Sequence, residues 1–368
     1  MNLLDDALSK IKPLDQEIMD KTWEYLDNLS KPLRSLGVLE EIAVKISGMT
    51  GEVFNKVNKK NILIFCADNG VCDEGVSGCS QEVTNIVTNN LPNYTTGVGI
   101  LAKFYGSEIK VIDVGVKGQI SNLNVVNKKV REGSRNMALG NALTREEVIK
   151  AINIGIESVD ILVSEGYNLL GTGEMGIGNT STSTAVIAAL LDLDVEDLVG
   201  LGAGLTEGGL ENKKKVLRRA LELNNPNKDD VIDVLSKVGG LDIASLCGSF
   251  IGAAKNRVPI VIDGLISSAA ALCAYKINET VKDFMFSSHK STEKAMNEVY
   301  KEMNLEPMFD LKMRLGEGSG CPIAFSIIES ALTIIKEMDT FDKAGLDNDE
   351  SKNYKKLYEE RKKYEKDV

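Results

Sequence analysis

Residues 61–70 read NILIFCADNG, a short apolar run that ends in acidic and small residues. The same pattern returns as IKVIDVG at 109–115, YNLLGTGEMG at 167–176 and VPIVIDG at 258–264. Each run is typical of a buried strand with a polar tip, and helical periodicity separates the runs, as in 144–166 and 242–257. The alternation predicts an α/β fold: a doubly wound, mostly parallel sheet flanked by helices, with ligands bound beyond the carboxyl ends of the strands.

The two ends of the chain differ from this middle. Residues 1–50 carry helical patterns broken at Lys31 and Pro32, and residues 322–340 form an apolar-faced helix that precedes a charged tail. We therefore expect two domains. A small helical domain would be built from residues 1–45 and 322–368, and a large nucleotide-binding and catalytic α/β domain would span residues 46–321.

Composition limits the chemistry. The chain has 368 residues, of which 43% are hydrophobic and 26% charged, so a disordered or collagen-like protein is excluded. Its formal charge of −11 argues against non-specific binding to nucleic acid or to an anionic membrane surface. With His289 as its one histidine it has no multi-histidine metal site, and acid–base work is expected to fall to carboxylates. We expect no metal and no cofactor.

The lack of an evident targeting signal and the spacing of the cysteines lead us to expect a cytoplasmic protein. The N-terminus, MNLLDDALSKIKPLD, is acidic and helical and does not resemble a signal peptide, and no apolar stretch is long enough to span a membrane. The six cysteines contain no CxxC pair, which favours reduced thiols.

The segment GTGEMGIGNTSTST at 171–184 contains a GxGxxG match between a predicted strand and a predicted helix. Alone, it would indicate an NAD-dependent oxidoreductase, but Glu174 inside the match would repel a pyrophosphate. Asn179 and Thr180 begin the hydroxyl-rich stretch that follows, which is suited either to a monophosphate at a helix start or to plain N-capping.

Three more segments carry candidate residues. The glycine-rich loop at 200–209 runs into three lysines, of which Lys213 is a candidate phosphate counter-charge. FMFSSHKST at 284–292 places His289 and Ser291 at a strand-to-helix junction. In RLGEGSG at 314–320, glycines flank Glu317; partial burial there would raise its pKa and make it a better base, whereas an incidental glutamate in a turn is the alternative.

Taken together, these residues resemble the nicotinate-nucleotide:dimethylbenzimidazole phosphoribosyltransferases of corrinoid lower-ligand assembly. The matching segments occur in family order between about residues 10 and 340: KPLRSLGVLE, CADNGVCDEGVS, TTGVGILA, VIDVGV, GEMGIGNTST, DVLSKVGGLDIA, VPIVIDGLISSAAAL, SHKSTEK and MRLGEGSG.

The resemblance implies a reaction and its residues. Nicotinate mononucleotide would give its ribose 5-phosphate to an aromatic base, yielding an α-ribazole phosphate and nicotinate, in a homodimer. Glu317 would be the general base that takes the azole N–H proton. Apart from the resemblance, positive charge develops at C1′ in the transition state, and we expect a nearby carboxylate, Glu174, to stabilise it. By the resemblance, the ribose phosphate would be held by Glu174, Gly176, Asn179, Thr180, Gly202, Lys213 and Ser291.

Departures from the family cluster in the acceptor half of the site. Many members of the family have Asp-His-Gly where this chain has Asp68, Asn69 and Gly70. Cys79 and Val87 occupy positions at which family members have polar side chains that reach the acceptor base. We place Asp68, Asn69, Cys79, Val87 and Leu315 around the acceptor. The base is left open between 5,6-dimethylbenzimidazole, another benzimidazole, adenine and a phenol.

Two further alternatives remain beside the oxidoreductase. A phosphoribosyltransferase that uses a diphosphate sugar would need two adjacent acids and a Thr-Gly-rich loop, whereas VIDGLISSAA at 261–270 has one acid and no such loop. A non-catalytic nucleotide-binding protein would bind the same ligands without turnover.

Overall fold

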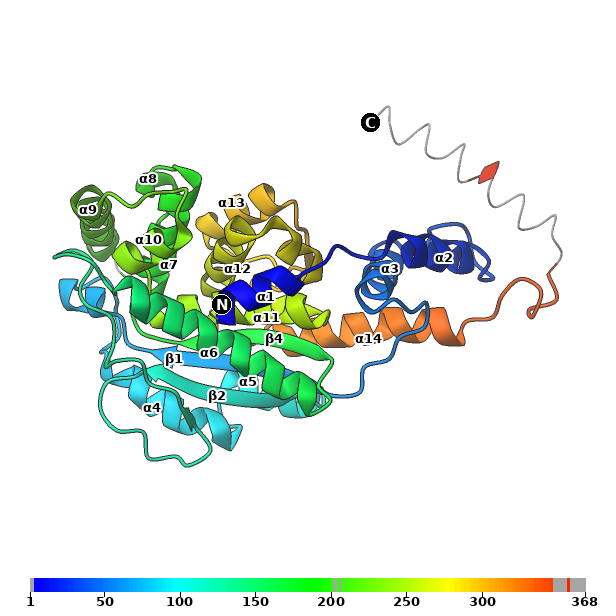
Figure 1. Ribbon diagram of the computed structural model, residues 1–368, viewed down its shortest axis with the longest axis horizontal. Coiled ribbons are helices and arrows are strands. Elements are labelled where there is room, and N and C mark those ends of the chain that lie inside the picture. The colour runs from blue at the N-terminus through cyan, green and yellow to red at the C-terminus, as the bar shows by residue number, and fades with distance from the viewer. Residues whose placement is uncertain (1–2, 201–203, 206, 347–355, 358–368) are drawn as a thin grey trace. The chain divides into compact units, whose positions relative to one another are not determined.

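The computed structural model describes residues 3–200, 204–205, 207–346 and 356–357 (Figure 1). The chain forms two compact units. The large unit comprises residues 1–12 and 58–325, and the small unit comprises residues 13–57 and 326–368. The predicted boundaries, 1–45 with 322–368 and 46–321, differ from this division in three places. The N-terminal helix belongs to the large unit and packs against its helices, residues 46–57 belong to the small unit, and residues 322–325 belong to the large unit.

The large unit is built on a seven-stranded sheet, counted over the described residues, in which every strand pair is parallel. The strand order is β3-β2-β1-β4-β5-β6-β7. The strands are β1 (Lys60–Ala67), β2 (Glu108–Gly115), β3 (Val126–Asn127), β4 (Leu169–Met175), β5 (Ile260–Ile262), β6 (Met285–His289) and β7 (Pro307–Phe309). The order reverses between β1 and β4, and this switch point is where doubly wound sheets leave a crevice for ligands.

Helices cover both faces of the sheet (Figure 1). The described helices of the large unit are α1 (Leu3–Lys10), α4 (Glu82–Asn90), α5 (Gly97–Phe104), α6 (Arg145–Ser164), α7 (Asn179–Leu191), α8 (Val195–Leu198), α9 (Glu207–Asn224), α10 (Val231–Val238), α11 (Leu241–Asn256), α12 (Leu265–Ile277) and α13 (Lys294–Met303), with 3-10 turns η1 (Gly70–Glu74), η2 (Leu91–Asn93) and η3 (Glu279–Phe284). The division between the units falls within α14 (Cys321–Glu337).

Glycines bring α6 and α11 into close contact. A Cβ on Gly155 would lie 2.0 Å from the carbonyl oxygen of Ser245, and one on Gly248 would lie 1.9 Å from that of Ile152. Only residues without a side chain permit the two backbones to approach this closely. α11 in turn contacts β1, β2 and β4, so its N-terminus is firmly placed beside the carboxyl ends of these strands.

The small unit contains α2 (Gln16–Asp27) and α3 (Val38–Thr50), which pack on one another, and the later residues of α14. The segment KPLRSLGVLE folds here, and its first and last residues, Lys31 and Glu40, form a buried ion pair with 3.0 Å between Nζ and Oε1. Arg34 adopts a left-handed φ of 58°, a conformation that glycine adopts more easily than arginine. These residues support the unit's own packing.

The predicted fold is confirmed, and the sheet is parallel throughout its described strands. All four predicted strands are present, because their apolar runs are buried on both faces, as in β1, where every residue after Lys60 is buried. The predicted helices at 144–166 and 242–257 correspond to α6 and α11, and a capping box between Thr144 and Glu147 begins α6.

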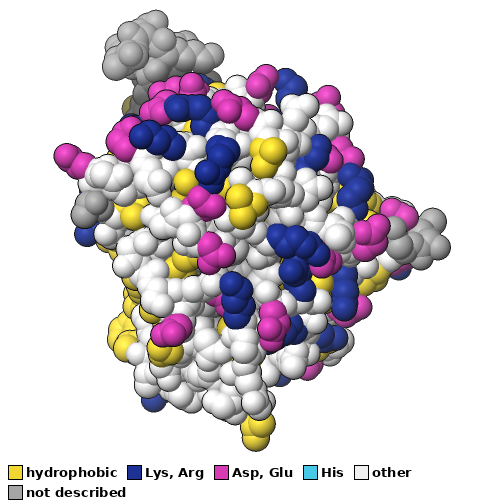
Figure 2. Space-filling view, turned by 90° about the vertical axis from the view of Figure 1, so that its left-hand side faces the viewer, with side chains coloured by type: hydrophobic (Ala, Val, Ile, Leu, Met, Phe, Trp, Pro, Cys, Tyr) yellow, Lys and Arg dark blue, Asp and Glu magenta, His cyan; other side chains and the backbone are white. Residues whose placement is uncertain are grey.

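The end of the large unit that carries α8 and α9 has a mixed surface. Figure 2 shows Lys and Arg side chains interspersed with Asp and Glu over this face, without a broad area of one sign. A polyanion binds through accumulated positive charge, so this face offers it little attraction.

Candidate active site

A cavity of about 250 Å³ lies in the large unit at the carboxyl ends of β4, β5 and β6. Its walls come from α4, the β4–α7 connection, the start of α12, the segment after β6 and the loop before α14. The lining residues are Val83, Val87, Glu174, Met175, Gly176, Ile177, Asn179, Thr180, Gly264, Leu265, Ile266, Ser267, His289, Ser291, Glu293, Arg314, Leu315, Gly316 and Glu317. The cavity therefore adjoins the switch point of the sheet, as expected for a ligand site.

Glu174 lies near the end of β4 and is 7% exposed. Its carboxylate accepts a hydrogen bond from the side-chain amide of Asn179, at the start of α7. Burial raises the pKa of Glu174 to about 8, the charges of Asp242 and Asp263 act in the same direction, and the Asn179 hydrogen bond opposes them. Glu174 is thus protonated near neutral pH in the free protein.

Glu317 occupies the turn between the segment after β7 and α14. Gly316, Glu317 and Gly318 have φ angles of 85°, 62° and 91°, a left-handed run that glycine adopts easily and glutamate does not. The Glu317 Oε2 atom accepts a hydrogen bond of 3.4 Å from the N–H of Val98, at the start of α5. Burial raises the pKa of Glu317, against this hydrogen bond and one from the N–H of Gly97. A carboxylate with a raised pKa is a better base near neutral pH.

Asp263, which follows β5, holds this turn in place. Its two carboxylate oxygens accept hydrogen bonds from the N–H groups of Gly318 (3.0 Å) and Gly320 (2.7 Å). Burial raises the pKa of Asp263 to about 7, and both N–H groups oppose the shift. The backbone on either side of Ser319 is thereby fixed to β5, and this fixes the direction of Glu317.

The GxGxxG match does not form a strand-to-helix turn, because its first two glycines lie within β4. A Cβ on Gly171 would lie 2.8 Å from that of Cys321, and one on Gly173 would lie 2.4 Å from the carbonyl oxygen of Glu317. These glycines let α14 and the Glu317 turn pack directly on the strand. The dinucleotide-binding interpretation is therefore not favoured.

Gly176, the last glycine of the match, has a packing role of the same kind. Its added Cβ would lie 2.3 Å from the carbonyl oxygen of Ala67 and 2.9 Å from Asp242 Oδ2. It also lines the cavity, together with Asn179 and Thr180. The chain thus crosses from β4 to α7 close against the end of β1.

Lys213 lies behind the cavity wall. It is completely buried in α9, and its ammonium donates a hydrogen bond of 2.9 Å to the Thr180 hydroxyl. Burial lowers the pKa of Lys213 to about 8, and Glu293 opposes this. Thr180 and Glu293 line the cavity, whereas Lys213 reaches it through Thr180. Gly202 lies outside the described residues.

His289 and Ser291 both line the cavity after β6. The Nδ1 atom of His289 is 2.9 Å from the Ser288 hydroxyl and 4.0 Å from Asp263 Oδ1. Burial lowers the pKa of His289. The ring is therefore neutral at pH 7 and is held between Asp263 and Phe309, on which it stacks.

The wall towards α4 is apolar. Val83 and Val87 line it, and the other apolar side chains that line the cavity are Met175, Ile177, Leu265, Ile266 and Leu315. Of the residues predicted around the acceptor base, Val87 and Leu315 thus lie on the cavity, and the other three do not.

Asn69 is buried behind the wall, where its amide faces Asp242, and Cys79 is exposed. Asp68 lines a separate cavity of about 420 Å³ with Gln81, Glu82, Asn85, Ile86 and Lys117. A residue's match to a position in the family pattern therefore does not determine whether its side chain reaches the cavity.

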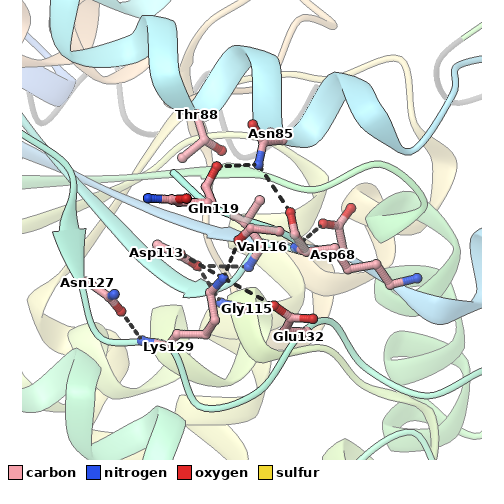
Figure 3. Close-up of polar contacts among 12 residues, drawn as sticks. Asp68, Asn85, Thr88, Asp113, Gly115, Val116, Gln119, Asn127, Lys129 and Glu132 are labelled. Carbon is pink, nitrogen blue, oxygen red and sulfur yellow. Dashed lines mark hydrogen bonds and ion pairs between the residues drawn. The ribbon is translucent and has the colours of Figure 1, made fainter. Parts of the chain in front are cut away.

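Asp68 and Asp113 hold the loop that follows β2 (Figure 3). Asp68 Oδ2 accepts a hydrogen bond from the N–H of Lys117 (2.7 Å), and Asp113 Oδ1 accepts from those of Gly115 (3.0 Å) and Val116 (2.8 Å). Asn85 of α4 donates to the carbonyl oxygens of Lys117 and Gln119. These contacts anchor α4, whose Val83 and Val87 form the apolar wall.

Sequence reasoning did not single out Asp242 and Asp263 as site residues. Asp263 is the acidic tip of the 258–264 run, a signal shared with Asp68, and this pattern identifies it. Asp242 carries no comparable signal, since it begins an ordinary helical segment and reaches Glu174 only through the fold.

Metal-ligand clusters and membrane-spanning helices are both absent from the described residues. No group of three or more His, Cys, Asp and Glu side chains among them is arranged to hold a metal ion. Within the same residues, no helix combines the length and apolar character that crossing a membrane requires.

Comparison with known proteins gives consistent matches. A family profile described as Phosphoribosyltransferase matches residues 11–346. The nicotinate-nucleotide–dimethylbenzimidazole phosphoribosyltransferase of Clostridium tetani is 54% identical over 346 residues, covering 94% of this chain and 96% of the relative. The protein of the same name from Clostridium acetobutylicum is 48% identical and covers 94% of this chain and 98% of the relative.

Solved structures agree with these sequence matches. The crystal structure of CobT from Thermus thermophilus is similar to this chain with a TM-score of 0.87 and 34% sequence identity. The alignment covers 90% of this chain and 99% of that one.

Proposed function

Because the chain belongs to the family of nicotinate-nucleotide:dimethylbenzimidazole phosphoribosyltransferases, we propose how its cavity carries out their reaction. The enzyme moves ribose 5-phosphate from nicotinate mononucleotide to an aromatic base in corrinoid lower-ligand assembly. The products are an α-ribazole 5′-phosphate and nicotinate. The observation that carries the proposal is that Glu317 and Glu174, two carboxyl groups with raised pKa, line one cavity.

Glu317 acts as the general base. It takes the N–H proton of the azole, and the lone pair of the other ring nitrogen forms the new bond to C1′. The bond from C1′ to the nicotinate nitrogen breaks, and its electrons neutralise the pyridinium ring. Attack on the face opposite the leaving group inverts the configuration from β to α. The turn that Asp263 anchors supports this role, since a base must be held at hydrogen-bond distance from its proton.

Glu174 faces the donor. Positive charge moves from the pyridinium ring towards C1′ as the bond breaks, and a carboxylate in a buried site stabilises such charge more than water does. The hydrogen bond from Asn179 keeps the side chain in one orientation. The Glu174 carboxyl group is neutral in the free enzyme, to which the donor binds, and it is ionised during the reaction.

The ribose phosphate binds at the start of α7 and beside β6. Gly176, Asn179 and Thr180 line the cavity at a helix N-terminus, which favours an anion. The Thr180 hydroxyl accepts from Lys213 and can donate to the phosphate, whereas the Asn179 side-chain amide donates to Glu174 and Asp242. Ser291 lines the same cavity, and Lys213 supplies the positive charge through its contact with Thr180. Gly202 is assigned here by the family resemblance alone.

The acceptor binds against α4. The apolar wall of Val83, Val87 and Leu315 supports 5,6-dimethylbenzimidazole or a closely related benzimidazole, because an apolar wall leaves the polar edge of adenine without partners. We further propose that the enzyme is a cytoplasmic homodimer. Exposed apolar side chains on α4 and α5, namely Ile86, Ile100 and Phe104, support a contact between copies.

A turnover assay tests the function. Nicotinate mononucleotide is incubated with the enzyme and, in separate reactions, 5,6-dimethylbenzimidazole, benzimidazole, adenine or a phenol, and products are identified by mass spectrometry. We expect nicotinate release with formation of the ribosylated benzimidazole at the highest rate. Release of nicotinate with none of the acceptors ribosylated would overturn the proposal.

Two controls separate the alternatives. A thermal shift with nicotinate mononucleotide and none with NAD would exclude the oxidoreductase. Binding of nicotinate mononucleotide without any product would indicate a non-catalytic nucleotide-binding protein.

A further inference from the structure

Asp242 is a buried acid that does not line the cavity. It is the second residue of α11 and has no exposed surface. Its Oδ2 atom accepts hydrogen bonds from the side-chain amides of Asn179 (3.2 Å) and Asn69 (3.4 Å), and its Oδ1 atom accepts one from the N–H of Ile243 (3.0 Å). A completely buried carboxylate destabilises the fold unless its neighbours offset the loss of hydration, so these three donors explain how Asp242 is tolerated.

The Asn179 amide joins Asp242 to Glu174. Its nitrogen donates to Asp242 and to Glu174, so the two hydrogens of one NH₂ group are shared between two carboxyl groups. Asn69 is oriented in turn, because its side-chain oxygen accepts a hydrogen bond of 3.4 Å from Thr182. The acid behind the wall is thus linked to the acid in the cavity through one side chain.

The charged groups that face Glu174 are acidic. Asp242 faces it from α11 and Asp263 from the end of β5, and both raise the pKa of Glu174. The Glu317 turn adds a backbone N–H that lowers it. The positive groups of the site lie elsewhere: Lys213 contacts Thr180, and Arg314 lines the cavity beside Glu317. His289 is neutral at pH 7.

Asp242 is the better placed of the two acids to carry charge. It lies in the first turn of α11, where the helix dipole favours an anion, and it accepts three N–H hydrogen bonds. Burial raises the pKa of Asp242 to about 6, which remains below the value of about 8 for Glu174. These three donors and the helix dipole favour the charge on Asp242 and therefore the proton on Glu174.

We propose that Asp242 is a positioning residue which, through Asn179, orients Glu174 and adds to its burial in keeping it protonated in the free enzyme, so that binding of nicotinate mononucleotide expels the Glu174 proton. The inference rests on the proposed function, because the cationic pyridinium ring is what favours the ionised form. The step balances: the Glu174 carboxyl group gives its proton to solvent, and the resulting carboxylate faces the ring and C1′. A positively charged pyridinium ring is thereby favoured over an uncharged ring.

The test is a proton count on binding. Titration calorimetry with nicotinate mononucleotide alone, in two buffers of different protonation enthalpy, measures the protons exchanged at pH 7.5. We compare the wild type with Glu174→Gln, which lacks the titrating group, and with Asp242→Asn, which lacks the neighbouring charge. A group with a pKa of about 8 that becomes fully ionised contributes release of about 0.75 proton at this pH.

The expected result is that the wild type releases about 0.75 proton more than Glu174→Gln, and that this excess is smaller in Asp242→Asn, where loss of the neighbouring charge lowers the pKa of Glu174. Asn69→Ala, which removes one hydrogen bond from Asp242, should give an intermediate count. The pH profile of kcat/KM provides a second readout: the limb due to Glu174 moves to lower pH in Asp242→Asn.

Two results would overturn the inference. The first is that the wild type and Glu174→Gln release equal numbers of protons when nicotinate mononucleotide binds. This comparison does not depend on whether an Asp242 variant folds. The second is an unchanged count and pH profile in a folded Asp242→Asn protein. Failure of the proposed function is distinct from both, since it would show as no binding of nicotinate mononucleotide to the wild type.

Discussion

Glu317 is held in a conformation that few non-glycine residues adopt, and its neighbours make that possible. A left-handed φ costs a glutamate of order 1 kcal/mol, which the hydrogen bonds that Asp263 accepts from Gly318 and Gly320 offset. The result is a carboxylate that lines the cavity with a raised pKa. Strain at this residue supports a functional role for its side chain.

Replacing Glu317 by Gln removes the proton acceptor but keeps the shape. We expect turnover with an azole to fall by about a hundred- to ten-thousandfold, the range of general-base catalysis, while nicotinate mononucleotide still binds. The measurements are steady-state rates and calorimetric binding of the donor. Glu306→Gln, at an exposed glutamate of the same unit, is the matched control. Wild-type rates for Glu317→Gln would exclude its role as the base.

The Lys213 charge is predicted to make donor binding depend on pH. Its pKa is lowered to about 8, so the ammonium is present below pH 8 and is lost as the pH rises through that value. The KM for nicotinate mononucleotide should then increase above pH 8. Lys213→Met should raise KM by about tenfold or more at pH 7 and abolish this rise, since it removes a charge-assisted hydrogen bond.

Lys215→Met, at an exposed position of the same helix, is the control for this experiment and should leave KM unchanged. A KM that is independent of pH between 7 and 9 in the wild type would contradict the assignment of Lys213.

At the scale of elements, β4 is the strand on which the site is assembled. It carries Glu174 on its length, and its glycines admit the Glu317 turn and the start of α14. The loop after β2 holds α4 in place: Asp68 accepts a hydrogen bond from the N–H of Lys117, and Asn85 of α4 donates one to the Lys117 carbonyl oxygen. The two walls of the cavity are therefore fixed by separate sets of contacts.

Gly173→Ala tests the packing of the Glu317 turn on β4. The added methyl group would lie 2.4 Å from the Glu317 carbonyl oxygen, so the turn must move. We expect a loss of stability of about 1–3 kcal/mol and a larger loss of activity than stability alone explains. Thermal unfolding and turnover are measured together.

The matched control is Gly208→Ala in α9, where nothing lies within 4 Å of the added atom. It should be neutral or slightly stabilising, because alanine favours helix more than glycine does. Full activity in Gly173→Ala would show that the contact does not position Glu317.

On the scale of the whole molecule, the exposed apolar side chains of α5 bear on how copies of the chain associate. Ile100 is 59% exposed and Phe104 is 77% exposed. We expect sedimentation to show a dimer for the wild type and a monomer for the Ile100→Asp, Phe104→Asp double variant, because a buried unpaired charge opposes association. Leu223→Asp on α9 is the control and should remain dimeric. A monomeric wild type at micromolar concentration would contradict the proposal.

The sequence by itself determined the class of fold and most of the cavity. Alternating apolar runs and helical segments are local patterns, so they predicted a parallel sheet whose acidic tips gather at one end. The flanking glycines marked Glu317 as a candidate base, and Glu174, Asn179 and Thr180 were found because they lie in one continuous segment that follows a strand.

Only the tertiary structure decided the rest. Asp242 and Asp263 reach the site from distant segments, and no local pattern encodes their distance from Glu174 or from the Glu317 turn. The family position of Asn69 suggested the acceptor pocket, whereas its amide faces Asp242 instead. The physical reason is that pKa values depend on burial and on neighbouring charges, which arise only once the strands and helices have packed.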